Sequence, residues 1–264
     1  SRRPWASDSC VSIDAHADMI GMRFFRFLPH RFRMTQSVRT LLAFAFSAFA
    51  ATALAAGPAA TPALTALRVE HQLSSLGADG IQRDVRFAER VYRQGDRVWI
   101  ARELPPASAH AEHDHADTHA GHKHADTDTA PRWIERDAKG ALTVRVVSES
   151  QQKNYAVEPA EYSNIGFDGS WATAYHLLDP AALKGMRVEG PVRNGVQTYR
   201  STQGERTVTV DWDVAGQYPR RVESRNATGT QRKLTRVTAL PAPAAAPWER
   251  AQRYAAADYT DLMD

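Results

Sequence analysis

The feature that most constrains the fold is a strict alternation of apolar and polar residues in several short segments. In GERTVTVDWDV, residues 204–214, the apolar side chains of Val208, Val210 and Trp212 fall on one side. LRVEHQL, residues 67–73, alternates in the same way. Successive side chains of a β-strand point to opposite faces, so a period of two is typical of a half-buried strand. We therefore expect a mainly β fold.

Turn residues divide the alternating segments into predicted hairpins. Residues 84–92 pair with residues 97–104, and residues 132–147 form a second hairpin. Asn194 and Gly195 tolerate the positive φ angles of a type I′ turn, and residues 219–240 supply two further strands around a short loop. Eight or nine strands with one polar face predict a curved antiparallel sheet.

Two segments carry helix signals. DPAALKGM, residues 179–186, has Asp179 as a predicted N-cap and Pro180 at the first helical position. The other predicted helix lies in residues 241–264, after a linker rich in proline and alanine. Its apolar side chains can dock on another chain or pack back on the chain's own sheet. These side chains are Trp248, Tyr254, Tyr259 and Leu262.

Residues 34–55 have the organisation of a secretory signal peptide. Arg39 gives a positive n-region, residues 41–54 form an apolar run, and Ala53-Leu54-Ala55 fits a cleavage site. The run is shorter than the roughly 18 to 20 apolar residues that span a bilayer, so we expect a cleaved leader and no stable membrane anchor. Residues 1–33 are interpreted as an upstream extension that is not native. The expected location is the periplasm.

Removal of the leader changes the charge of the chain. Residues 1–55 carry seven of the 33 Lys and Arg and three of the 30 Asp and Glu, so the remainder has a formal charge of −1. This charge gives no support for a nucleic-acid partner. Cys10, the only cysteine, is lost as well. What remains is a predicted β domain over residues 56–240, followed by the predicted C-terminal helix.

Two stretches suggest a family. FAERVYRQGDRVWI (Phe87–Ile100) and TVTVDWDVAGQYPRRVES (Thr207–Ser224) each join two strands by a short turn. In this layout the chain resembles the periplasmic lipoprotein-carrier and envelope-stress-sensor (LolA/RseB-like) superfamily. The resemblance implies an open half-barrel over a hydrophobic cavity, with a few short helices and a concave face that shelters an acyl chain or a partner peptide. Residues 105–131 have no counterpart in that pattern.

Residues 105–131 contain the most distinctive chemistry of the chain. The segment lacks Leu, Ile, Val and aromatic residues, so we expect one long disordered loop rich in histidine. Neutral imidazole binds Zn²⁺ and Cu²⁺, and nearby carboxylates can add oxygen ligands. The segment is similar to histidine-rich loops of periplasmic zinc-uptake proteins. This similarity favours zinc as the bound metal. The predicted metal ligands are His110, His113, His115, His119, His122, His124, Asp114 and Asp117.

These observations predict an exported, non-enzymatic metal-binding accessory protein that captures zinc or copper and hands it to a metal transporter or an envelope protein. The alternative is a carrier or sensor of lipidated envelope components that uses the concave face of the sheet. A third reading is a structural protein that binds a partner through its C-terminal tail. The sequence contains no H-E-x-x-H or G-x-S-x-G motif, and we expect no enzyme activity. His71 and His176 are interpreted as core or edge histidines.

Overall fold

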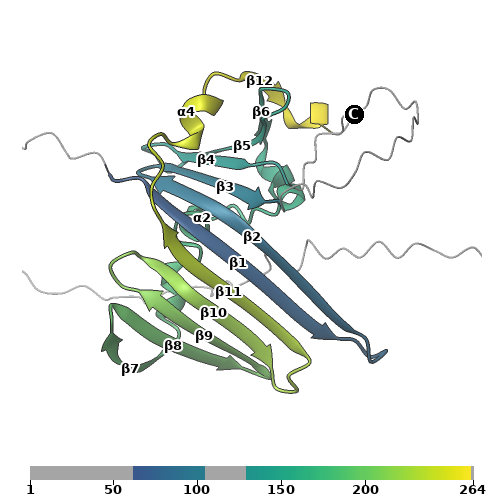
Figure 1. Cartoon of the computed structure of the whole chain (residues 1–264), viewed down its shortest axis with the longest axis vertical. Coiled ribbons are helices and arrows are strands. Elements are labelled where there is room, and N and C mark those ends of the chain that lie inside the picture. The colour runs from purple at the N-terminus through teal and green to yellow at the C-terminus, as the bar shows by residue number, and fades with distance from the viewer. Residues whose placement is uncertain (1–61, 105–128, 263–264) are drawn as a thin grey trace, which may run out of the picture.

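The computed structural model describes residues 62–104 and 129–262. These residues form one twelve-stranded sheet in the order β12-β6-β5-β4-β3-β2-β1-β11-β10-β9-β8-β7 (Figure 1). All neighbouring strands are antiparallel except β12, which runs parallel to β6. The strands are β1 (Thr65–Leu76), β2 (Gln82–Gln94), β3 (Arg97–Glu103), β4 (Arg132–Arg136), β5 (Leu142–Ser148), β6 (Lys153–Val157), β7 (Arg187–Arg193), β8 (Val196–Gln203), β9 (Arg206–Asp213), β10 (Tyr218–Asn226), β11 (Gln231–Leu240) and β12 (Ala255–Asp258).

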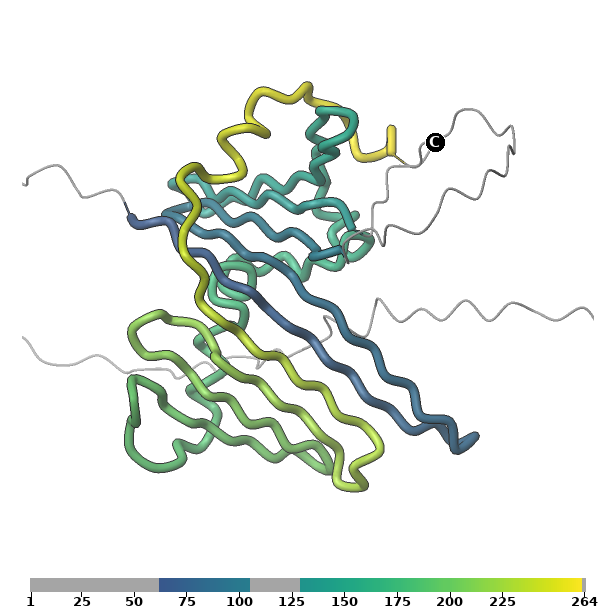
Figure 2. Tube along the Cα trace, in the orientation of Figure 1, coloured from purple at the N-terminus to yellow at the C-terminus, as the bar shows by residue number. Residues whose placement is uncertain are grey.

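The predicted fold class is confirmed: the described chain is mainly β, and its sheet is open, with β12 and β7 at the two edges. The predicted hairpins are present as β2–β3, β4–β5, β7–β8 and β10–β11. At the β7–β8 turn, Asn194 has φ 50° and Gly195 φ 75°, as a type I′ turn requires. The long strands β1 and β2 cross the middle of the sheet, and their hairpin projects beyond the neighbouring strands (Figure 2).

Three short helices separate the two halves of the sheet in sequence. They are η1 (Pro159–Ile165), α2 (Trp171–His176) and α3 (Pro180–Leu183), and we call residues 159–183 the helical cover. Asp179 caps α3 as predicted, since its side chain accepts a hydrogen bond from the backbone N–H of Ala181 at 2.8 Å. Neither η1 nor α2 was predicted from the sequence.

The C-terminal tail differs from its prediction. A helix was expected there, but α4 (Pro247–Ala251) is a single turn, followed by β12 and by η2 (Tyr259–Leu262). The helix ends because the backbone N–H of Ala255 donates to the carbonyl of Gln152 at 3.0 Å, and β12 then pairs with β6. Pairing with the sheet overrides the helix propensity of the alanines in β12. The tail packs on its own chain.

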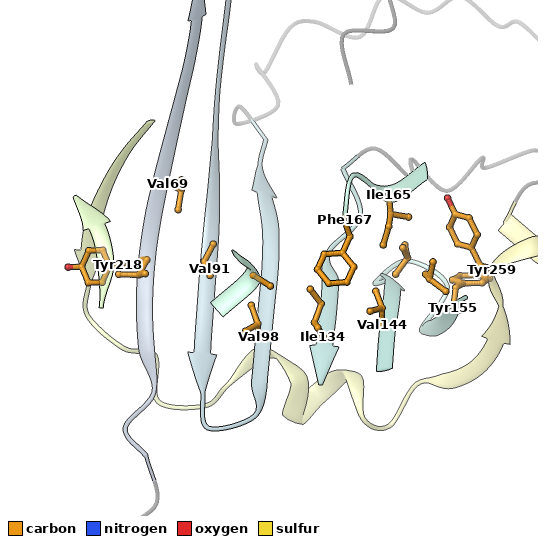
Figure 3. Close-up of a cluster of buried hydrophobic side chains, with 14 of the residues drawn as sticks. Val69, Val91, Val98, Ile134, Val144, Tyr155, Ile165, Phe167, Tyr218 and Tyr259 are labelled. Carbon is orange, nitrogen blue, oxygen red and sulfur yellow. The ribbon is translucent and has the colours of Figure 1, made fainter. Parts of the chain in front are cut away.

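The sheet buries side chains on both faces. The inner face carries Val69, Val91 and Ile134, which point to the same side of the sheet as the helical cover (Figure 3). The outer face carries Trp99 and Trp133, which pack against Trp248 of α4. Fully burying an aliphatic side chain contributes roughly 1.5 to 3 kcal/mol, so each face holds a substantial part of the stability.

Several predictions fall on other parts of the chain. The upstream extension, the signal peptide at 34–55 and the predicted metal ligands between His110 and His124 lie outside the described residues. Among residues 62–104 and 129–262, no helix has the length and apolarity needed to cross a membrane.

Candidate functional site

A pocket of about 270 Å³ lies between the inner face of the sheet and the helical cover. Its volume is close to the lower end of the range of about 300 to 1,000 Å³ that is typical of ligand sites. Its walls are mainly apolar. The apolar residues are Val69, Leu73, Phe87, Ile100, Ala130, Ile165, Phe167, Ala174, Leu177, Leu178 and Val222.

The floor of the pocket follows from the strand register. Val222 of β10 faces Thr235 of β11, which faces His71 of β1, which in turn faces Phe87 of β2. These four side chains therefore form one row across four strands on the inner face. His71 and Phe87 stack with their ring centroids 4.6 Å apart. The row combines two aromatic rings with small side chains, which leaves space beneath the cover.

Glu89 lies next to this row and is partly buried, with 19% of its side chain exposed. Arg132 Nη2 donates to Glu89 Oε1 at 2.9 Å. His71 Nε2 lies 3.3 Å from Glu89 Oε2, within ion-pair distance, although it makes no well-aligned hydrogen bond within the described residues. Burial raises the pKa of the Glu89 carboxyl, but the neighbouring His71 and the charge of Arg132 outweigh burial, so the pKa lies below its usual value.

Arg132 also connects the sheet to the helical cover. Its Nη1 donates to the carbonyl of Ile165 at 3.0 Å and to that of Gly166 at 3.3 Å. Gly166 ends η1 with φ 65°, a left-handed conformation that favours glycine. One guanidinium thus binds Glu89 on the floor and two carbonyls in the roof.

Arg93 makes a second connection to the cover, at the end of α2. It is 4% exposed, and its Nη1 donates to the carbonyl of Tyr175 at 2.6 Å. Its Nη2 donates to Gly216, in the turn between β9 and β10. His176 Nδ1 donates to the carbonyl of Gln217 in the same turn at 2.8 Å. Burial lowers the pKa of Arg93, but the guanidinium stays charged. The cover is therefore attached to the sheet through both η1 and α2.

Arg102 reaches the pocket from β3. It lies two residues after Ile100, so both side chains point to the inner face. The Arg102 guanidinium lies over the Phe87 ring, with its carbon 4.0 Å from the ring centroid. A guanidinium in this position is held by a cation–π interaction while the N–H groups at its edge stay available.

The predicted site residues divide into two groups. His71 and His176 were both interpreted as core or edge histidines. His71 lies in the pocket lining, whereas His176 is the last residue of α2. The predicted metal ligands lie outside the described residues, so the metal site stays a prediction. Within the described ranges, no group of three or more His, Cys, Asp or Glu side chains could hold a metal ion.

Glu89, Arg102 and Arg132 were not predicted as site residues from the sequence. Each is charged but occupies an inward position in an alternating strand, two residues from Val91, Ile100 and Ile134 respectively. A charge at an inward position is the signal that could have found them, because buried charges need partners. Together these residues make an apolar pocket with a fixed polar patch, an arrangement suited to binding an amphiphile.

No protein-family model matches the chain, and no curated protein matches its sequence. Among solved structures, an uncharacterized conserved protein from Thermus thermophilus is 12% identical with a TM-score of 0.34, covering 74% of this chain and 90% of that one. A LolA superfamily protein from Nitrosomonas europaea is 9% identical with a TM-score of 0.29, covering 66% and 84%. A chain in the MucA/MucB complex of Pseudomonas aeruginosa is 11% identical with a TM-score of 0.33. The match covers 70% of this chain and 55% of that one. The chain thus resembles LolA-like structures, as predicted, at the level of a weak overall similarity.

Proposed function

We propose that this protein is an exported, non-enzymatic carrier or sensor that binds an acyl chain of a lipid or of a lipidated envelope component in the pocket beneath its helical cover. The observation that carries the proposal is the pocket itself: eleven apolar residues surround a cavity of about 270 Å³. The predicted signal peptide supports an exported location.

The contacts around the cavity support a site that exists before the ligand arrives. Arg132 and Arg93 attach the cover to the sheet by hydrogen bonds to backbone carbonyls, so the roof does not depend on a ligand for its position. A preformed pocket lowers the ordering cost of binding. An apolar chain that enters it exchanges water for the side chains of Val69, Leu178 and Val222.

The apolar character of the walls favours an acyl chain over a polar metabolite. An acyl chain gains about 0.8 kcal/mol for each methylene group that it buries, whereas a polar group loses hydrogen bonds to water unless the site replaces them. His71, Arg102 and Arg132 lie around Glu89, and half of the residues that line the pocket are aliphatic or aromatic. A ligand that suits this distribution has a long apolar part and a small polar end.

A bulky substitution inside the pocket tests the proposal. Val222→Trp fills the cavity from β10, where Val222 is partly exposed. Val188→Trp is the matched control, because Val188 is 54% exposed on the edge strand β7 and lies outside the pocket lining. We expect a fluorescent acyl probe to bind the wild type and V188W alike and to bind V222W at least about tenfold more weakly. Absence of binding by the wild type, or equal binding by V222W, would overturn the proposal.

The metal-binding function predicted from the histidine cluster is a separate proposal that this experiment does not address. It involves residues outside the described part of the chain.

A further inference from the structure

We infer that the pocket selects single-chain amphiphiles with a carboxylate head group, and that Arg102 binds that carboxylate. The inference rests on the proposed function, because it names the ligand class of the same pocket. It is carried by the position of Arg102 in the lining of an apolar cavity and by the pairing of the other charges around that cavity.

Arg102 is held in place by an aromatic ring, and its charge also acts on Glu89. Its guanidinium stacks on Phe87 at 4.0 Å, and Phe87 is itself stacked on His71. Within residues 62–104 and 129–262, Arg102 forms no hydrogen bond or ion pair, although its charge helps to lower the pKa of Glu89. Stacking fixes the plane of the guanidinium, while its five N–H donors lie at the edge of that plane. Such a group is prepared to accept an anion at low entropic cost.

The other charged groups of the pocket already have partners. The two oxygens of Glu89 face Arg132 and His71, at 2.9 and 3.3 Å. Lys233 is engaged in an interaction of its own. On the cover, Asp168 accepts from the backbone of Ser170 at 2.9 Å, and Asp179 from that of Ala181 at 2.8 Å. Arg102 is therefore the cation of the described lining that has donors to offer a ligand.

Charge complementarity favours a carboxylate over a phosphate. A carboxylate carries one charge and two oxygens, which match one guanidinium edge as a bidentate pair. A phosphate monoester carries a charge of about −1.5 to −2 at neutral pH. Its excess charge would lie near Glu89, the register partner of Arg102, and the two anions would repel each other. A neutral head group would leave the Arg102 donors without an acceptor.

The size of the cavity favours one chain over several. Its volume of about 270 Å³ is just below the usual range for ligand pockets, and its walls at Val69, Ile100 and Leu178 lie on both the sheet and the cover. A single chain can lie between these walls while its head group stays at Arg102. The ligand class is that of a free fatty acid.

Calorimetric titrations of the full chain with dodecanoate, dodecanol and dodecyl phosphate test the inference at neutral pH, below the concentrations at which these ligands form micelles. We expect the wild type to bind dodecanoate about tenfold more tightly than dodecanol, since charge-assisted hydrogen bonds contribute about this much. Arg102→Gln should lose the preference for dodecanoate and bind dodecanol as the wild type does. Arg102→Lys, which keeps the charge but not the bidentate geometry, should keep part of the preference.

Arg86→Gln is the matched control. Arg86 is an exposed arginine on β2 that lines a different, polar pocket, so this variant should keep the preference of the wild type. The inference is overturned if dodecanol or dodecyl phosphate binds the wild type as tightly as dodecanoate does, or if R102Q keeps the preference. If the wild type binds dodecanol and dodecanoate equally well, the inference is overturned but the proposed function stands. Failure of all three ligands to bind would overturn the proposed function as well.

Discussion

At the residue scale, the pocket floor depends on Glu89. Its carboxylate lies between Arg132 and His71, and both partners are as buried as Glu89 itself, each with 19% of the side chain exposed. Arg132 uses its remaining donors on carbonyls of the cover. Loss of the Glu89 charge would therefore leave a partly buried guanidinium without its counter-ion, which is more costly than the loss of a surface ion pair.

Glu89→Gln should lower the free energy of unfolding by about 3 kcal/mol at neutral pH. The folded-state pKa of Glu89 lies below its unfolded value of about 4.3, so the carboxylate contributes stability above about pH 4.3 and loses this contribution as the pH falls through the folded pKa. Denaturant unfolding of both proteins between neutral and acidic pH should show the difference shrinking on acidification. Glu70→Gln, which alters an exposed ion pair with Arg68, should change the stability by less than about 1 kcal/mol. A pH-independent difference for E89Q would contradict this role.

For individual residues, the direction of a side chain was predictable from the sequence, but its contacts with other strands were not. The alternation of β2, β3 and β4 was enough to predict that Glu89, Arg102 and Arg132 point to the side of their apolar neighbours, but not that the three strands bring them together. That depends on strand order and register. His71 could be placed on the apolar side of its strand, yet its stacking on Phe87 follows from pairing between strands and not from the spacing of residues in either of them.

At the scale of elements, the hairpin strands and the short helix α3 were predictable, whereas η1 and α2 were not. Each hairpin combined an alternating pattern with a turn signal such as Asn194–Gly195, and the structure contains these hairpins. The helices η1 and α2 are seven and six residues long, too short for a period of 3.6 to be recognised. In the tail, Ala255 to Ala257 favour a helix by propensity, but parallel pairing with β6 makes them a strand.

Arg93→Met should loosen the helical cover without unfolding the sheet. It removes the hydrogen bonds to Tyr175 and to the β9–β10 turn, each of which involves a charged donor and contributes roughly 1.5 to 3 kcal/mol. We expect amide hydrogen exchange in α2 to accelerate by about tenfold or more, with exchange in β1 unchanged. Arg97→Met is the control, because Arg97 pairs with Glu135 far from the cover. Equal acceleration in both variants would show that Arg93 does not hold the cover.

Trp248→Ala should reveal how much α4 contributes to the outer face. Trp248 is 1% exposed and packs in one cluster with Trp99 and Trp133. Truncation of a buried tryptophan costs about 3 to 5 kcal/mol. Thermal unfolding should therefore show a large loss of stability, while the affinity for an acyl chain stays the same because the pocket lies on the inner face. Weaker ligand binding by folded W248A would mean that the two faces are coupled.

At the scale of the whole molecule, the sheet carries two different surfaces. The tail covers the outer face around Trp99 and Trp133, whereas the inner face keeps a cavity under the cover. The third reading of the sequence, in which the tail docks on another chain, is corrected for Trp248 and Tyr259, since both are buried within this chain. The mainly β class and the antiparallel sheet were predictable from alternation, whereas the open half-barrel form was implied by the resemblance. The cavity was expected from the resemblance alone, because its volume depends on packing between distant elements.

The histidine cluster leads to a prediction that is independent of the pocket. Calorimetric titration with Zn²⁺ and Cu²⁺ should show submicromolar binding that weakens on mild acidification, because protonated imidazole with a pKa near 6.5 cannot bind a metal ion. Replacement of His110, His113, His115, His119, His122 and His124 by Asn should abolish this binding. The same variant should keep its affinity for an acyl chain. Metal binding that survives the replacement would place the metal ligands elsewhere in the chain.

Photo-crosslinking with a fatty acid that carries a diazirine near the end of its chain tests the central claim most directly. Mass spectrometry of the labelled protein locates the acyl chain without relying on a substitution. We predict adducts on the inner face of β1 and β10, at residues such as Val69, Leu73 and Val222, and on residues 173–178 of the cover. Adducts confined to the outer face around Trp248, or to the edge strand β7, would contradict the claim that the pocket binds the chain.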